Sequence, residues 1–425
     1  MVDVLDWANR EDHVVIPFGG GTSVVGGVEA DPEWTEETVV ISLDTRKLDR
    51  VLEVDTTSNT ARIQAGATGP VLQEQLREHD RCLRHYPQSY EFSTLGGWIA
   101  TRASGHYATL QTRIDDFVES VRMVTPSGTI QTRRLPSTGA GPDPEGFILG
   151  SEGTLGVITE ASLQVQKEPK YRAKASVAFE DFEDAVETTR TLAQTRLFPT
   201  NLRLLDTREA FLNQVVEDPT NILLLGFEDS MVPSAGDDLE HGLDICRQRG
   251  GTVLSQKKSV PESQEDDKDE SGEWRQSFLE GPYLYNVLVS LGVIVDTFET
   301  ALPWDRFYEA HHAIKNDVQA ALQEVCGDGT VTCRFTHVYP DGVAPYYTFL
   351  GPARRGEELK QWKQLKSVAS DAVVDHGGTI THHHAVGRVH KPWLERERDP
   401  LILESLRAVK QKLDPDELLN PGVLL

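Results

Sequence analysis

The sequence predicts a mixed α+β chain of two domains, an N-terminal ligand-binding domain and a second, α/β domain. Its 425 residues exceed what a single hydrophobic core usually serves. Hydrophobic residues make up 38% and charged residues 26%, which is typical of a folded globular protein. Strand-like and helical runs alternate along the chain, and their pattern changes near Pro169.

The first domain, residues 1–168, is expected to combine short strands with short helices. The segment 2–9 has an amphipathic pattern, and 69–80 is expected to be a helix because Pro70 suits a first helical turn. Apolar or β-branched residues at strand spacing predict the strands of this domain, which are 13–17, 38–43, 51–54, 60–65, 118–125, 128–133 and 156–166.

The second domain, residues 169–399, begins with a predicted strand at 175–179 and a predicted helix at 181–196. The apolar runs 222–227 and 287–295 are expected to be buried. Residues 400–425 form a third part: an amphipathic helix over 400–413, ended by Pro415, and a tail that returns to the first domain.

The charge of the chain argues against polyanionic partners. With 67 acidic and 42 basic residues, the net charge of −25 would repel nucleic acid and anionic membranes. We interpret the charge as a solvated shell rather than an acidic interaction surface, and the densest acidic run, 262–270, as an exposed loop. The expected partner is a small-molecule substrate, and a homodimer remains open.

The cysteines predict neither a metal nor a disulfide framework. None of the four stands in a CxxC pair; they are Cys82, Cys246, Cys326 and Cys333. A reducing compartment fits this pattern. The sequence also shows no apolar stretch long enough to span a bilayer and no signal-peptide order at its N-terminus, so we expect a cytoplasmic protein.

A glycine-rich loop directly follows the first strand. In Pro17 to Ser23, three glycines leave successive backbone N–H groups able to converge on an anion, although a tight turn alone would also explain them. The loop matches neither a P-loop, because Gly27 and Val28 stand where Lys and Ser/Thr are required, nor a Rossmann fingerprint. Two further Gly/Ser/Thr clusters, at 89–105 and 150–156, suggest one extended ligand that touches several loops.

The three clusters, in this order and spacing, resemble the FAD-binding PCMH-type domain of the vanillyl-alcohol oxidase and p-cresol methylhydroxylase flavoproteins. The sequences of two segments, Ser93 to Gly97 and Thr101 to Gly105, are similar to those of the alkyldihydroxyacetonephosphate synthase branch of this superfamily. The resemblance implies a PCMH-type FAD domain with a C-terminal cap domain, and a further strand and helix before Met1. The residues it implies for FAD are Pro17, Phe18, Gly19, Gly20, Gly21, Thr22 and Ser23 at the pyrophosphate; Gln88, Ser89, Tyr90, Glu91, Phe92, Ser93, Thr94, Thr101, Arg102, Ala103 and Ser104 at the flavin; and Glu152, Gly153, Thr154, Leu155, Gly156, Val157 and Ile158 toward the adenosine.

The resemblance also implies how the cofactor is held. Some members of the superfamily tether the flavin through a histidine in the first loop, where this chain has Thr22 and Ser23. We therefore expect non-covalent FAD.

The second half contains the adjacent residues His382, His383 and His384. Alternate side chains of an extended segment point in opposite directions, so the three imidazoles are not expected to share a metal. A proton-transfer site near neutral pH and a polar turn both remain open.

The synthase branch carries such a triplet, preceded by a tyrosine proposed as acid/base. The resemblance places Tyr346 at that position, with Tyr347 as the neighbour if the register shifts, and carries over Arg203 as a support of the active site. From the residues alone, Tyr346 could equally be a core tyrosine and Arg203 a surface charge.

One departure bears on the substrate. In the synthases an arginine binds the substrate phosphate, and this chain has Tyr285 there. A missing charge-assisted contact would weaken phosphate binding by about 1.5 to 3 kcal/mol. Two enzymatic functions therefore stay open, a synthase-like exchange of an acyl group for a fatty alcohol and the oxidation of a 2-hydroxy acid such as D-lactate or glycolate. A non-catalytic flavin-binding module is the third alternative.

Overall fold

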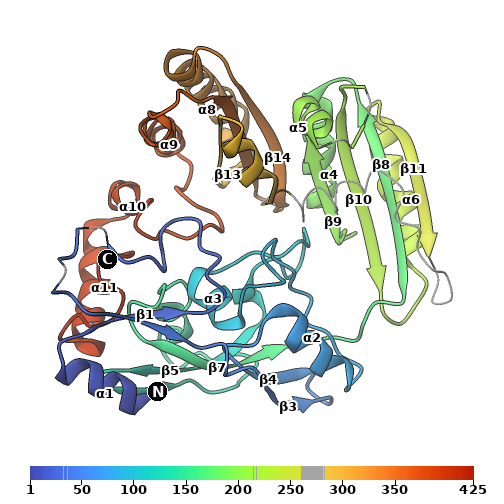
Figure 1. Ribbon diagram of the computed structural model, residues 1–425. Helices are drawn as coiled ribbons and strands as arrows, with labels where there is room; N and C mark the ends of the chain where they lie inside the picture. Colours follow the sequence, from blue (N-terminus) through green and yellow to red (C-terminus); the bar gives the residue numbers. More distant parts are fainter. Residues whose placement is uncertain (32, 36, 214, 217, 260–280, 282) are drawn as a thin grey trace. The chain divides into compact units, whose positions relative to one another are not determined.

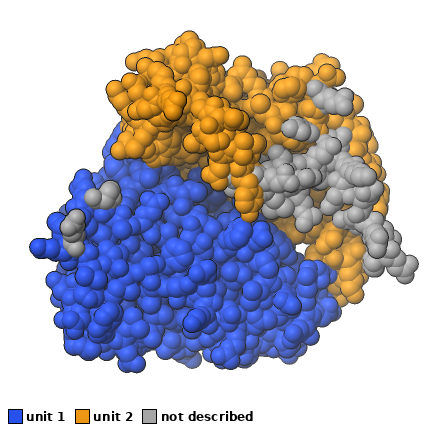
Figure 2. Space-filling model, viewed as in Figure 1, with its two compact units in different colours: residues 1–105, 111–168, 383–425 blue, residues 106–110, 169–382 orange. Residues whose placement is uncertain are grey.

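A computed structural model describes all residues except 32, 36, 214, 217, 260–280 and 282. The chain divides into two compact units (Figure 2). Unit 1 comprises residues 1–105, 111–168 and 383–425, and unit 2 comprises 106–110 and 169–382. The acidic run at 262–270 lies outside the described residues.

Unit 1 is built on two sheets (Figure 1). A five-stranded antiparallel sheet has the order β3-β4-β7-β5-β6, and β1 pairs with β2 in parallel. The strands of unit 1 are β1 (Val14–Phe18), β2 (Val40–Asp44), β3 (Val51–Asp55), β4 (Thr60–Gln64), β5 (Val118–Thr125), β6 (Gly128–Gln131) and β7 (Val157–Gln164). Its α-helices are α1 (Val2–Arg10), α2 (Gly69–Arg77), α3 (Leu95–Thr101), α10 (Lys391–Glu397) and α11 (Pro400–Leu413).

Both ends of the chain contribute to one small core of unit 1. Val15 of β1 forms a parallel bridge to Leu419, and Asn420 donates its backbone N–H to the Val15 carbonyl. This core joins the two ends through buried apolar side chains, which are Leu5, Ala8, Val15, Val124, Val157, Leu418 and Leu419.

Unit 2 is built on an eight-stranded sheet with the order β11-β8-β10-β9-β14-β15-β12, in which β13 pairs with β15. These strands are β8 (Tyr171–Phe179), β9 (Asn201–Leu205), β10 (Asn221–Asp229), β11 (Thr252–Ser259), β12 (Val293–Glu299), β13 (Leu302–Pro303), β14 (Thr330–Val338) and β15 (Gly342–Pro352). The helices of unit 2 that the structure describes in full are α4 (Phe182–Gln194), α5 (Thr207–Leu212), α6 (Ala235–Gln248), α8 (Trp304–Cys326) and α9 (Glu358–Asp375).

The two faces of this sheet differ in chemistry, because side chains alternate along each strand. One face is apolar and packs against α4, α6, α8 and α9; its members include Leu204, Leu225, Phe335 and Tyr347. The other face is polar at β9, β14, β15 and β12, where it carries Arg203, Thr332, Arg334, Tyr346, Thr348, Thr297 and Glu299.

The α+β prediction is confirmed, and two details differ from the sequence interpretation. The chain rejoins unit 1 at His383, so α10 as well as α11 belongs there, whereas we expected the return at residue 400. The apolar run 287–295 is not wholly buried: Val287, Val289 and Leu291 are more than half exposed, and β12 begins only at Val293. Apolar composition without an alternating pattern did not distinguish a helical end from a buried strand. In the described part of the chain, no helix has both the length and the apolarity to cross a membrane.

Candidate active site

The three glycine-containing segments meet within unit 1. A Cβ atom on Gly19 would lie 2.3 Å from Thr94 Oγ1, and one on Gly20 would lie 2.1 Å from the carbonyl oxygen of Phe92. A Cβ atom on Gly153 would lie 3.0 Å from Pro17 Cγ. Only a hydrogen fits at the first two positions, so glycine is what lets the first segment pack on the second.

Most side chains of these segments hold the loops together. Ser93 Oγ donates to the Ser89 carbonyl and accepts from Trp98 Nε1 at 2.7 Å. Further contacts of this kind are Tyr90 to the Gly69 carbonyl, Thr101 to the Gly97 carbonyl, Thr154 to the Ser151 carbonyl, Thr94 with the Gly97 N–H, and Arg102 with Asp115. The segments therefore offer a ligand mainly their backbone.

The residues present fit a dinucleotide such as FAD. Gly21 adopts a left-handed φ of 68°, which turns the backbone of the first segment sharply. The buried hydroxyls of Ser104 and Ser151 have no hydrogen-bond partner among the described residues, so each could bond to a ligand. Ser23 Oγ instead accepts the N–H groups of Val25 and Gly27.

The third segment differs from the expectation in its side chains. Leu155, Val157 and Ile158 lie in hydrophobic cores, and Val157 and Ile158 pair with β5. The Glu152 carboxylate accepts the N–H groups of Val386 and Gly387 at 2.9 and 2.8 Å. A contact of this segment with the adenosine, if formed, would therefore come from its backbone; that role stays a prediction.

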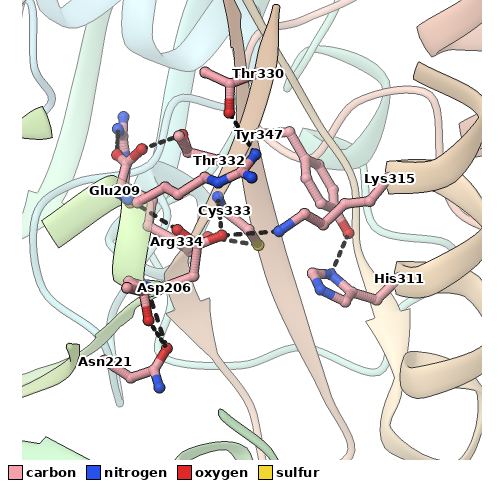
Figure 3. Close-up of polar contacts among 12 residues, drawn as sticks. Asp206, Glu209, Asn221, His311, Lys315, Thr330, Thr332, Cys333, Arg334 and Tyr347 are labelled. Carbon is pink, nitrogen blue, oxygen red and sulfur yellow. Dashed lines mark hydrogen bonds and ion pairs between the residues drawn. The ribbon is translucent and has the colours of Figure 1, made fainter. Parts of the chain in front are cut away.

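On the polar face of the unit 2 sheet, Arg334 belongs to a buried ionic network (Figure 3). Its acidic members, Asp206 and Glu209, lie where β9 leads into α5. Glu209 forms an ion pair with Arg334 and accepts a hydrogen bond from Thr332. Asp206 accepts hydrogen bonds from Lys315 Nζ and from the Cys333 N–H, each at 2.9 Å. Because Asp206 directly precedes α5, these bonds connect the start of α5 to α8 and to β14. Burial raises the pKa of Asp206, although Lys315 opposes the shift.

Arg203, carried over from the resemblance, lies on the same face and is 2% exposed. Its guanidinium lies 3.3 Å from His106 Nδ1 and 3.4 Å from the His106 carbonyl oxygen. Burial and the nearby Arg334 charge lower the pKa of Arg203 to about 9. This is a core position rather than a surface charge.

The two tyrosines of β15 face opposite ways. Tyr347 lies in the apolar core with its hydroxyl 3.0 Å from His311 Nδ1. Tyr346 lies on the polar face, where its hydroxyl donates to Thr297 Oγ1 at 3.0 Å and its ring stacks under the Arg334 guanidinium at 4.0 Å. The register therefore places Tyr346, not Tyr347, on the polar side, while its acid/base role stays a prediction.

Tyr339 contacts the first histidine of the triplet. Its hydroxyl lies 2.7 Å from His382 Nε2, while the ring of His337 lies 5.1 Å from that of His382. Glu299 is 1% exposed and accepts from the His382 N–H at 2.9 Å and the Thr381 hydroxyl at 2.8 Å. Its other oxygen lies 3.9 Å from His382 Nδ1. His383 and His384 belong to unit 1, with their rings 4.8 Å apart.

Sequence reasoning missed Tyr339 and gave Glu299 no role. A signal was available, since Pro340, Asp341 and Gly342 after Tyr339 are a turn sequence, and Tyr339 exchanges backbone hydrogen bonds with Gly342 where β14 turns into β15. Glu299 is an acid inside a strand whose other described residues are mostly apolar, a position where an acid requires partners.

Comparison with known proteins decides the family. The model of FAD linked oxidases, C-terminal domain, matches residues 168–424, and that of the FAD binding domain matches residues 1–133. The chain belongs to the FAD-linked oxidase family. This confirms the predicted flavoprotein superfamily and two-domain fold, and it indicates FAD as the cofactor.

Among relatives, this chain is 30% identical to an alkyldihydroxyacetonephosphate synthase of Trypanosoma brucei brucei over 450 residues, covering 100% of this chain and 71% of the relative. It is 26% identical to the glycolate oxidase subunit GlcD of Bacillus subtilis, covering 96% of this chain and 83% of that protein. A solved alkyldihydroxyacetonephosphate synthase superposes with a TM-score of 0.80 at 26% identity, over 99% of this chain and 74% of that one.

Proposed function

We propose that this member of the FAD-linked oxidase family is an alkyldihydroxyacetonephosphate synthase-like transferase, in which Tyr339 and His382 move a proton at the substrate. The single observation that carries the proton-transfer role is the 2.7 Å contact between the Tyr339 hydroxyl and His382 Nε2, with the Glu299 carboxylate behind the same histidine. The synthase relatives support the reaction class.

Glu299 sets the tautomer of His382 in this proposal. A carboxylate near Nδ1 favours the proton on that nitrogen, which leaves Nε2 to accept from Tyr339. When Tyr339 gives its proton to Nε2, the imidazolium is stabilised by the Glu299 charge. The Tyr339 phenolate then takes the substrate proton and returns it in the reverse sense.

The three glycine-containing segments, which are the proposed cofactor loops, belong to unit 1, and the proposed acid–base groups Tyr339 and His382 belong to unit 2. FAD, when bound, would supply an electron-accepting ring to the carbon that loses its proton. We propose that FAD is held without a covalent bond. Acid precipitation should leave the yellow flavin in the supernatant, and flavin in the pellet would contradict this.

A second function is favoured by Tyr285. Its phenol lies in the field of Tyr346, Arg334 and Glu209, and burial raises its pKa. A neutral tyrosine thus stands where the resemblance implies a phosphate-binding arginine, and the nearby Arg334 charge is already paired with Glu209. Loss of that arginine weakens the case for a phosphate substrate, and the GlcD relative supports oxidation of a 2-hydroxy acid as the alternative.

Anaerobic mixing of the holoprotein with candidate substrates separates the two functions. Acyl-dihydroxyacetonephosphate and a fatty alcohol should give alkyl exchange with no lasting bleaching of the flavin if the synthase function is right. D-lactate, glycolate or a longer 2-hydroxy acid that bleaches the flavin, without alkyl exchange, would establish the oxidase instead.

A Glu299→Gln variant tests the role of the histidine in either reaction. Loss of the charge behind His382 should lower kcat by roughly 10- to 100-fold, because the imidazolium loses its counter-charge. The pH profile of kcat should change in the same variant. Unchanged kcat and pH profile would remove Glu299 from the mechanism.

A further inference from the structure

Glu152 occupies an unusual place in unit 1. It is 8% exposed, has a left-handed φ of 50°, and belongs to the third glycine-containing segment, between Ser151 and Gly153. Its two carboxylate oxygens accept from consecutive backbone N–H groups, those of Val386 and Gly387. These two residues follow the histidine triplet in the sequence by two and three positions.

The turn that Glu152 holds is strained by itself. Ala385 has φ 70° and Gly387 has φ 56°, and a left-handed conformation at a non-glycine residue persists only where surrounding contacts fix it. Within unit 1 the turn is docked just after the first glycine-containing segment, because the N–H groups of Arg388 and Val389 both donate to the Val25 carbonyl.

The same junction includes the C-terminal tail. Asn420 Nδ2 donates to the Gly27 carbonyl at 2.9 Å and to the Glu152 carbonyl at 2.8 Å, both buried. A Cβ atom on Gly27 would lie 3.6 Å from Glu152 Oε2. The residues just after the first glycine-containing segment, the third segment and the turn after the triplet therefore meet around Glu152.

We propose that Glu152 is a positioning residue that couples the cofactor loops to the turn after the histidine triplet, so that FAD bound to these loops orders residues 385–389. The coupling rests on the proposed function, since it requires bound FAD. The clamp, by which we mean the two hydrogen bonds from the Val386 and Gly387 N–H groups to the Glu152 carboxylate, does not rest on it. Ser151, next to Glu152, has a buried hydroxyl without a partner among the described residues, so a ligand bonded there would fix the backbone that carries the carboxylate.

Only the carboxylate can satisfy both N–H groups. A glutamine has a single acceptor oxygen, and its NH2 group would face the second N–H. Glu152→Gln should therefore release one end of the clamp while keeping the size of the side chain. Such a change tests positioning rather than packing.

Hydrogen exchange read by mass spectrometry over 385–389 tests the proposal without any assay of activity. At pH 8, where the Glu152 carboxylate is ionised, holoprotein of the parent chain is compared with the same chain stripped of FAD and with Glu152→Gln. Exchange of Val386 and Gly387 should be at least tenfold faster in both. The matched control is Glu160→Gln, which removes a carboxylate of β7 that pairs with Arg62 and touches neither amide; it should leave this exchange unchanged.

The outcomes separate the two ideas. Unchanged exchange in Glu152→Gln overturns the clamp, and unchanged exchange on removal of FAD overturns the coupling. If the parent chain binds no FAD, the proposed function fails while the clamp is still judged from Glu152→Gln. Should that variant not fold, Glu152→Asp, whose carboxylate is one methylene shorter, gives the same comparison. Once a substrate is known, Glu152→Gln should lower kcat with little change in KM or in flavin content.

Discussion

The two units differ in which groups form their candidate sites: backbone in unit 1 and side chains in unit 2. In unit 1 the cofactor loops are shaped by glycines, and their side chains bond to the protein itself, as Ser93 does with Trp98 and Tyr90 with Gly69 of α2. In unit 2 the chemistry lies in side chains on one face of a sheet and at its end, such as Arg334 and Tyr339. A site formed by backbone can be recognised in the sequence from its glycine-rich composition. A site formed by side chains of several strands can be recognised only when the pairing register of those strands is known.

Breaking the side-chain site should have the largest effect. Tyr339→Phe removes the hydroxyl that bonds to His382, and kcat should fall by about 10³-fold, since a positioned acid or base typically contributes 10² to 10⁴. The control is Tyr347→Phe, whose hydroxyl faces His311 in the apolar core. It should lose about 1 kcal/mol of stability and keep its kcat. Equal kcat in Tyr339→Phe and the parent would exclude Tyr339.

The buried carboxylate of unit 1 should make stability depend on pH. Burial raises the pKa of Glu152 from 4.5 to about 7, against the lowering effect of its two N–H bonds. The folded state then binds more protons than the unfolded state between these values. The contribution of Glu152 is complete below pH 4.5 and is lost as pH rises to 7, by about 3 kcal/mol.

Denaturant unfolding of the parent chain and Glu152→Gln at pH 5 and pH 8 measures this contribution. The stability of the parent relative to the variant should fall by about 3 kcal/mol between the two pH values. A constant difference would show that Glu152 titrates normally in the folded chain.

The backbone site is tested by adding one carbon atom. Gly20→Ala places a Cβ atom 2.1 Å from the Phe92 carbonyl oxygen, so the first and second segments must separate. We expect a loss of about 2 kcal/mol in stability and weaker FAD binding. Gly139→Ala, where a Cβ atom meets nothing within 4 Å, should leave both unchanged. Calorimetry and flavin titration measure the two quantities, and normal FAD affinity in Gly20→Ala would show that the close approach is dispensable.

The smallest effect is expected from a side chain of the cofactor loops. Ser93→Ala leaves the Trp98 indole N–H without its acceptor, which should lower stability by about 1 kcal/mol. FAD affinity should change little, because this hydroxyl is already bonded within the protein. A large loss of FAD affinity at unchanged stability would instead place Ser93 on the cofactor.

The same contrast explains how much the sequence could predict. The glycine clusters predicted the loops that meet at Gly19, Thr94 and Gly153. Glycine positions can be read from the sequence without knowledge of the structure, and they mark where two backbones can approach closely. The helix at 400–413 has the bounds expected from its amphipathic pattern and Pro415. The buried sheet of unit 2 was recognisable from runs such as Ile222 to Phe227.

The side-chain site was harder to predict because its members come from distant strands. The choice between Tyr346 and Tyr347 required the β14–β15 register, in which Arg334 pairs with Tyr346. Tyr339 was overlooked because it lies after the strand, where a turn rather than a pattern of alternation places it. The bonds of Glu152 to Val386 and Gly387 join positions more than 230 apart, which no local pattern encodes.

The small core shared by both ends has a consequence for synthesis. Leu5 and Val15 precede unit 2 in the sequence, and Leu418 and Leu419, which complete their core, follow it. Unit 2 lies between them in the sequence, apart from residues 106–110, so most of its strands are available for pairing earlier. The small core of unit 1 can therefore close only after unit 2 has been synthesised, and contacts of such high sequence separation form slowly. Until then, the cofactor loops lack the tail residues that complete their support.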